Sequence, residues 1–237
     1  MGSYHSQVSS QRGAGMNNHV IFDIIDQNPG MTDVDRLVNL YWALSGVLVA
    51  KVPGEVVEIG CNKGGTSVFL RMVMNHFDPH RELHVYDSFQ GLPEPGPADQ
   101  RAGGYSLSAG LCAASPDDVR ASFAQRDLAP PVIHTGWFAN SLPTELPDHL
   151  AFAYLDGDFY DSIMTSLQHV YPRMAPGAIA VIDDYCDSSL NPRAWPGLPG
   201  PKRACDEFFA DKPESMSLLV GTAHLAFGYF RKALPAG

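Results

Sequence analysis

The sequence predicts an α/β fold with a mostly parallel, seven-stranded sheet covered by helices on both faces. Two observations predict this fold: short apolar runs alternate with segments of helical period, and the chain closes with two strand-like runs joined by a tight turn. A third observation is that several apolar runs end in acidic residues or glycines. Ligands of such sheets bind beyond the carboxyl ends of the strands, so these ends are the candidate functional positions.

The first half of the chain alternates helix and strand twice. Apolar residues recur at helical spacing across 32–50, with Thr32 as a candidate N-cap. The apolar run VVEIG at 56–60 is short and bounded by a Pro-Gly pair, which predicts a strand. A second helix at 65–77 and a second strand, LHVYD at 83–87, follow.

A loop rich in glycine and proline at 91–110 precedes the second half. Ser115 and Pro116 then open a helix, as N-cap and first helical residue. The remaining elements are predicted strands at 131–136, 151–158 and 178–184, a helix at 160–173, a turn at 175–177, a helix at 201–210 and a terminal hairpin at 217–230. Because the hairpin reverses the chain, the sheet is predicted to end in an antiparallel pair.

Composition and charge limit the classes of function. The 237 residues predict one domain at 18–237 behind a flexible polar tail at 1–17. With 26 acidic and 16 basic residues, the net charge of −10 argues against nucleic acid or an anionic membrane as partner. The chain has no apolar run long enough to span a membrane, no secretory signal and no paired cysteine motif, which predicts a cytoplasmic protein with free thiols.

A glycine-rich turn follows the first predicted strand, in the segment EIGCNKGGTS at 58–67. Its spacing is G-x-x-x-G-G, unlike the G-x-G-x-x-G of dinucleotide-binding folds. The second strand ends in Asp87, an acid that can accept hydrogen bonds from both ribose hydroxyls. A cofactor that carries a nucleoside explains both features. S-adenosylmethionine is favoured over NAD because its sulfonium cation tolerates the nearby Glu58, whereas a pyrophosphate would not. The alternative is a plain turn, with Asp87 capping the next loop.

Acidic residues also follow two later strands. Asp156 and Asp158 end the strand at 151–158, and Asp183 and Asp184 end the strand at 178–184. Neighbouring parallel strands would bring these carboxylates together, and no basic residue lies nearby in the sequence to pair with them. A hard divalent cation, Mg²⁺, Mn²⁺ or Ca²⁺, would relieve their repulsion. The alternative is that each aspartate caps the following helix or turn.

Five motifs occur in one order along residues 56–210: VVEIGCNKGGTS, VYDSFQGLPEP, GWFANSLP, YLDGDFYDS and VIDDY. Together they resemble the macrocin O-methyltransferase family of metal- and S-adenosylmethionine-dependent enzymes. Members of this family methylate sugar hydroxyls in macrolide and aminocoumarin antibiotics. The resemblance implies the class I methyltransferase (Rossmann-like) sheet, which agrees with the predicted strands, and a homodimer.

The resemblance also implies roles for individual residues. Asp156, Asp183 and Asp184 are the implied ligands of Mg²⁺, with Mn²⁺ or Ca²⁺ as substitutes, and Asp158 is the implied general base. Asp87 would hold the ribose of the cofactor. The residues implied to contact S-adenosylmethionine are Glu58, Gly60, Gly64, Thr66, Ser67, Asp87, Ser88, Trp137, Phe138 and Asp156.

The favoured function is therefore methylation of a hydroxyl on a sugar or cyclitol of a secondary metabolite in antibiotic biosynthesis, with a small, glycosylated acceptor. The Pro- and Gly-rich loop at 186–200 is expected to form part of the acceptor rim. One alternative is methylation of a catechol-like vicinal diol, which could chelate the same cation. Two others are a phosphoryl-transfer hydrolase using the D-x-D of Asp156 and Asp158, and a binding module without catalysis.

Some conspicuous residues are expected to be structural. His134 is interpreted as a buried or capping histidine. Tyr41 and Trp42 are interpreted as core residues of the first helix, with contact to substrate as the alternative. The terminal runs SLLVG and HLAFGYF are expected to be core strands without chemistry.

Overall fold

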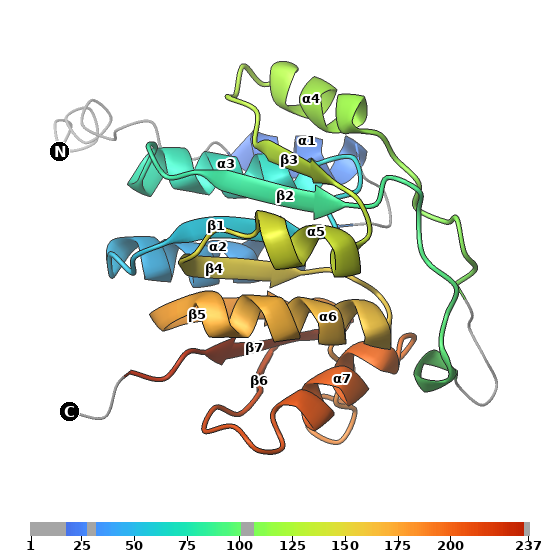
Figure 1. The fold of residues 1–237 in the computed structure, drawn as a ribbon. Helices are drawn as coiled ribbons and strands as arrows, with labels where there is room; N and C mark the ends of the chain where they lie inside the picture. The colour runs from blue at the N-terminus through green and yellow to red at the C-terminus, as the bar shows by residue number, and fades with distance from the viewer. Residues whose placement is uncertain (1–17, 28–31, 101–106, 235–237) are drawn as a thin grey trace, which may run out of the picture.

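The short apolar runs of the sequence are the strands of a single sheet. The computed structural model describes residues 18–27, 32–100 and 107–234. Its strands are β1 (Glu55–Ile59), β2 (Leu83–Asp87), β3 (Val132–Thr135), β4 (Leu150–Leu155), β5 (Met174–Ile182), β6 (Ser217–Leu219) and β7 (Phe227–Arg231). They form a 7-stranded sheet of order β3-β2-β1-β4-β5-β7-β6 (Figure 1).

Helices cover both faces of this sheet (Figure 1). They are α1 (Asn18–Gln27), α2 (Val34–Val49), α3 (Gly65–Phe77), α4 (Pro116–Ala124), α5 (Phe138–Glu145), α6 (Tyr160–Val170) and α7 (Gly200–Phe208), with short 3-10 turns η1 (Pro97–Asp99) and η2 (Tyr171–Arg173). In Figure 1, α1, α2 and α3 lie behind the sheet, and α5, α6 and α7 lie in front. Every residue of β4 is buried, as expected for a parallel strand between two helical layers.

The predicted architecture is confirmed. β1 to β5 are parallel to one another, and β7 pairs antiparallel with both β5 and β6. The N-terminus of α4 also follows the prediction: Ser115 and Asp118 form a capping box ahead of Pro116. Within the described ranges, no helix combines the length and the apolar character needed to cross a membrane.

Two local predictions are wrong. The N-cap of α2 is Asp33 rather than Thr32, because the Asp33 carboxylate accepts a hydrogen bond from the Arg36 amide at 2.8 Å. The predicted turn at 175–177 lies inside β5, which continues because the Gly177 amide donates to the Lys232 carbonyl at 2.9 Å. Two helices were also not predicted.

The unpredicted helices are α1 and α5. In α1, Ile24 is fully buried, so this segment belongs to the core although its surroundings in the sequence are polar. In α5, Pro143 lies inside a helix of 8 residues, and a helix was not predicted there because proline disfavours the helix interior. The predicted tail at 1–17 lies outside the described residues, and the single domain at 18–237 stays a prediction.

Candidate functional site

The register of the sheet aligns the ends of β1, β4 and β5. Ile59 pairs with Leu155, and Leu155 pairs with Ile182. The next backbone bonds continue this ladder: the Asp156 amide donates to the Ile59 carbonyl at 2.8 Å, and the Asp183 amide donates to the Leu155 carbonyl at 2.9 Å. Asp156 and Asp183 therefore leave neighbouring strands at the same edge of the sheet.

A cavity of about 660 Å³ opens at this edge. The predicted site residues on its wall are Gly60, Asp87, Ser88, Trp137, Phe138, Asp156, Asp158, Asp183 and Asp184. Its walls also contain loops and turns from the two ends of the chain, including the start of α2 and the connection between β6 and β7. The volume is in the range of pockets that enclose a small organic ligand.

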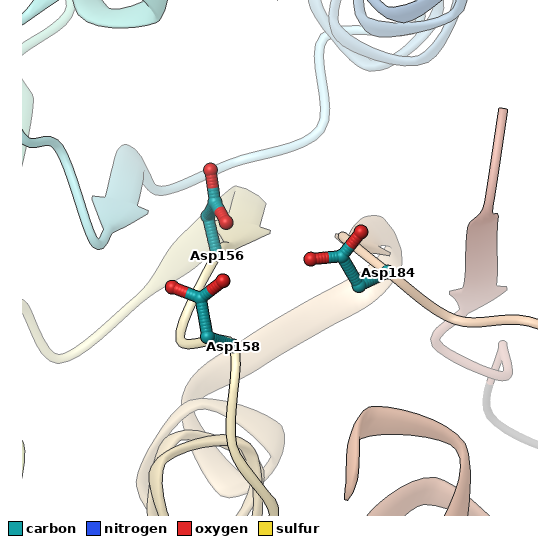
Figure 2. A group of neighbouring side chains, drawn as sticks. All are labelled: Asp156, Asp158 and Asp184. Carbon is teal, nitrogen blue, oxygen red and sulfur yellow. The ribbon is translucent and has the colours of Figure 1, made fainter. Parts of the chain in front are cut away.

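Three carboxylates converge in this cavity, those of Asp156, Asp158 and Asp184 (Figure 2). One oxygen from each lies within 4.8 Å of the others. Burial, and next the charge of Asp183, raise the pKa of Asp156 and Asp184 well above the usual range and that of Asp158 to about 7. Three hard oxygen donors whose charges repel one another suit a divalent cation.

The backbone at two of these acids is unusual. Asp158 and Asp184 have φ of 58° and 53°, in the left-handed region that side chains other than glycine rarely adopt. Such conformations cost free energy and persist where the surrounding structure imposes them, often at functional sites. Both turns direct their carboxylates toward Asp156 (Figure 2).

The fourth acid, Asp183, has a partner. Arg36, in the first turn of α2, donates from Nη2 to both Asp183 oxygens, at 2.7 and 2.9 Å. The two side chains are 16% and 5% exposed, and the guanidinium carbon lies 5.3 Å from the centroid of the Phe227 ring. No basic residue lies near these acids in the sequence, but Arg36, 147 positions from Asp183, pairs with it in the fold. The role of Asp183 as a metal ligand stays a prediction.

The glycine-rich turn is fastened to Asp87. One carboxylate oxygen accepts hydrogen bonds from the amides of Cys61 and Asn62 at 3.1 and 2.8 Å, and the other accepts from the Phe89 amide at 2.8 Å. Gly60 has φ +94°, and a Cβ there would lie 1.8 Å from the Asp156 carbonyl oxygen, so this position requires glycine. Asp87 thus shapes the turn and also faces the cavity.

Four residues predicted to contact the cofactor are not on the cavity wall in the described structure: Glu58, Gly64, Thr66 and Ser67. Glu58 is 1% exposed and accepts a hydrogen bond from the Ser67 hydroxyl, and burial raises its pKa to about 8. Gly64 is the N-cap of α3, with φ 81°. The contact of these residues with a cofactor stays a prediction.

Other segments complete the cavity wall. Trp195 and Leu198 come from the loop at 186–200 that was expected to border the acceptor, whereas Arg36 and His224 were missed by sequence reasoning. The terminal run 224–230 was expected to be a core strand without chemistry, but His224 is exposed, precedes β7 and lies on the cavity wall. The antiparallel direction of β7 could have indicated it, because the residues before an antiparallel strand lie at the carboxyl ends of its parallel neighbours.

Two aromatic residues of α2 lie elsewhere. Tyr41 and Trp42 are 38% and 46% exposed and do not line the cavity, so the interpretation as core residues is wrong. Trp42 packs edge-on against Tyr229, with ring centroids 5.3 Å apart. His134 fits its structural interpretation: it stacks on Tyr86 and bonds to the Glu145 carboxylate at 2.6 Å.

Solved structures show the same arrangement of elements. The O-methyltransferase NovP is 30% identical to this chain and superposes with a TM-score of 0.71, covering 86% of this chain and 82% of NovP. An O-methyltransferase from Bacillus cereus in complex with SAH is 15% identical, with a TM-score of 0.59 over 95% of this chain and 96% of the other. At that identity the likeness concerns the fold alone.

Curated relatives are similar over part of their length. A tetracenomycin-C rhamnosyl 4'-O-methyltransferase from Streptomyces olivaceus is 38% identical over 65% of this chain and 62% of the relative. The mycinamicin III 3''-O-methyltransferase from Micromonospora griseorubida is 35% identical over 66% and 65%. The matches thus span less than two thirds of these relatives. Residues 6–196 match the sequence family described as macrocin-O-methyltransferase (TylF), and the chain belongs to this family.

Proposed function

We propose that this protein is an S-adenosylmethionine-dependent O-methyltransferase that acts on a sugar hydroxyl in antibiotic biosynthesis. One observation carries the proposal: a single cavity joins the Gly60 turn and Asp87 to the three carboxylates of Asp156, Asp158 and Asp184. The names of the relatives support the reaction and the sugar acceptor. The SAH complex of the Bacillus cereus protein supports the choice of methyl donor for this fold.

The cofactor would occupy the part of the cavity near β1, β2 and β3. Oδ2 of Asp87 already accepts from two amides, whereas Oδ1 accepts only from the Phe89 amide and would accept a hydrogen bond from a ribose hydroxyl. Trp137 and Phe138, at the start of α5, would flank the adenine. Gly60 has no side chain, which leaves space for a ligand to approach the backbone.

The acid cluster fits a divalent metal ion. Its donor atoms are all carboxylate oxygens, and they lie within 4.8 Å of one another. Burial and mutual repulsion raise the pKa of Asp156, and a bound cation would relieve this repulsion. The family resemblance and the geometry both favour Asp156 and Asp184 as ligands. For the third ligand the resemblance implies Asp183, whereas the convergence of oxygens favours Asp158. When bound, Mg²⁺ would stabilise the negative charge that develops on the acceptor oxygen.

Asp158 would take the proton from the acceptor hydroxyl. Its carboxylate faces the cavity beside Asp156, where it can receive a proton from a hydroxyl of a bound acceptor. Removing this proton increases the nucleophilicity of the oxygen that attacks the methyl group. The cavity walls hold donor and acceptor in line, and this orientation supplies much of the rate enhancement.

Calorimetry and a transfer assay together test the proposal. We expect SAH to bind in the micromolar range and NAD not to bind. With S-adenosylmethionine, the protein should methylate glycosylated polyketides rather than a simple catechol, and EDTA should abolish turnover until Mg²⁺ is restored. Turnover of the catechol alone would instead favour a vicinal-diol acceptor, and full activity in EDTA would exclude the metal.

Two variants separate the alternatives for the third ligand. Asp158→Asn should reduce the rate and leave Mn²⁺ affinity nearly unchanged if Asp158 is the base, whereas Asp183→Asn should weaken Mn²⁺ binding if Asp183 is a ligand. SAH affinity should stay within about twofold in both, because Asp87 ends β2, and β1 separates β2 from the strands that precede these acids. The opposite pattern in Mn²⁺ titrations would assign Asp158 as the ligand.

A homodimer is part of the same proposal. The outer face of α2 exposes Val38, Trp42 and Val49 by 53%, 46% and 65%. Apolar side chains that gather on one helix face are a common feature of subunit interfaces. Light scattering on the purified protein should give twice the mass of the chain, and Trp42→Glu should shift it toward the monomer. A monomeric wild type would refute this part.

A further inference from the structure

The order of the strands in the sheet determines the order of the wall residues along the cavity. Asp87 follows β2 and Gly60 follows β1, whereas the acids follow β4 and β5, and β7 comes next in the sheet. If the cofactor occupies the β2–β1 end, the acids lie in the middle, and the acceptor must approach from the β7 side. The wall there includes Trp195 and His224.

The indole ring of Trp195 packs against Gly197. A Cβ at Gly197 would lie 1.9 Å from Cζ2 of the indole, so the ring covers the space above a buried glycine. The Trp195 amide donates to the His224 carbonyl at 2.9 Å, which ties the loop to the β6–β7 turn. The side chain remains 37% exposed, on the wall of the cavity. It is therefore an aromatic surface that is positioned before any ligand arrives.

His224 has a defined tautomer in its neutral form. Its Nδ1 lies 3.0 Å from the Arg193 carbonyl oxygen. Because a carbonyl oxygen only accepts, Nδ1 carries the hydrogen, and Nε2 is left with a lone pair. The imidazole is thus an acceptor suited to a hydroxyl donor, and it stands on the same wall as the indole.

The turn that carries His224 is braced from two sides. The Asp35 carboxylate of α2 accepts hydrogen bonds from the amides of Thr222 and Ala223 at 2.7 and 2.9 Å. Arg193 donates to the Gly221 carbonyl at 3.2 Å. Three segments far apart in the sequence therefore hold this wall in place, and preorganised groups bind ligands at a lower entropic cost.

We infer that Trp195 and His224 form the sugar-recognition wall of the acceptor site: the apolar face of a pyranose stacks on the indole, and Nε2 of His224 accepts a hydrogen bond from a sugar hydroxyl. The inference rests on the proposed sugar O-methyltransferase function. Pyranose rings present C–H groups on one face and hydroxyls at the edge, and an aromatic plane beside a single acceptor matches both.

The test compares variants on binding and on turnover. The probe is p-nitrophenyl α-L-rhamnopyranoside, measured by calorimetry in the presence of SAH and Mg²⁺, with p-nitrophenol as the sugar-free control. Trp195→Ala should weaken binding of the glycoside at least about tenfold, as expected when an aromatic anchor is truncated. Trp195→Phe should recover most of the affinity. His224→Ala should cost about three- to tenfold, the range expected for one hydrogen bond.

Matched variants exclude a general loss of structure. Trp137→Ala, at the cofactor end of the same cavity, should weaken SAH binding and leave glycoside affinity in saturating SAH nearly unchanged. Trp195→Ala should do the reverse and should keep the melting temperature within a few degrees. For an acceptor that turns over, Trp195→Ala should raise KM more than it lowers kcat.

The outcomes distinguish two failures. The sugar wall would be overturned if Trp195→Ala and His224→Ala left glycoside affinity unchanged, or if they weakened binding of the glycoside and of p-nitrophenol equally. Methyl transfer by the wild type would then still support the proposed function. A wild type that binds the glycoside through Trp195 and transfers no methyl group to any glycoside would overturn the proposed function while the wall stands. A wild type that does not bind the glycoside would overturn the wall.

Discussion

Replacing Arg36 by methionine should destabilise the protein far more than removing its partner. The guanidinium and the Asp183 carboxylate are 16% and 5% exposed, and their atoms approach to 2.7 Å. At an effective dielectric constant of about 20, two unit charges about 4 Å apart attract by roughly 4 kcal/mol. Removing one member of a buried pair leaves an uncompensated charge and typically costs about 3–5 kcal/mol. We expect a loss of this size for Arg36→Met.

Asp183→Asn should cost much less. The charge of Asp183 is the largest electrostatic contribution to the raised pKa of Asp156, Asp158 and Asp184, so its removal relieves repulsion within the cluster. Arg36 would keep its attraction to Asp156. We expect a loss of about 1 kcal/mol or less, and the double variant should recover at least about 2 kcal/mol of the cost of Arg36→Met.

Urea denaturation of the four proteins in EDTA at pH 7.5 measures these differences. In a chain of this size, Arg36→Met should lower the melting temperature by roughly 6–20 °C. An Arg36→Met variant within 1 kcal/mol of wild type would refute the reasoning, because it would mean that water or another group compensates Asp183. Equal losses for the two single variants would refute the asymmetry.

Three further predictions concern the glycine turn and its surroundings. Burial raises the pKa of Glu58 from 4.5 to about 8, so the folded state holds a proton that the unfolded state releases between these values, and stability falls as pH rises through this window. Glu58→Gln should remove this slope and gain roughly 2–5 kcal/mol relative to wild type between pH 5 and pH 9 in denaturant titrations; parallel curves would contradict it. Asp87→Ala should weaken SAH binding about 10- to 100-fold by calorimetry, and unchanged affinity would remove Asp87 from the site. Gly60→Ala should destabilise by more than about 2 kcal/mol, because its Cβ would meet the Asp156 carbonyl; a variant as stable as wild type would show that the turn can move aside.

The sequence predicted the sheet better than the helices because strand signals were local. β2 runs from Leu83 to Asp87, as its apolar run indicates, and the motif acids fall where the paired strands end. α5 was hidden by Pro143, and α1 by the polar segment that precedes its apolar residues in the sequence. Local periodicity carries little information where one buried residue or one tolerated proline decides the outcome.

The parts of the site that were missed depend on contacts between distant segments. Arg36 and Asp183 are 147 positions apart, and only the packing of α2 against the sheet brings them together. His224 reaches the cavity because β7 reverses direction beside β5. Motif reasoning identified the acids and the glycine turn, since these follow strands directly, but it contained no signal for a partner supplied by another layer of the fold.

Adjacent residues of α2 connect two functions of the cavity. Asp35 holds the turn of His224, and Arg36 holds Asp183 beside the acid cluster. A ligand that displaces the first turn of this helix would therefore change both contacts at once. By thermodynamic linkage, any effect of acceptor binding on metal affinity must be matched by an equal effect of metal on acceptor affinity. Under the proposed function, this helical turn would therefore couple binding of the metal to binding of the sugar.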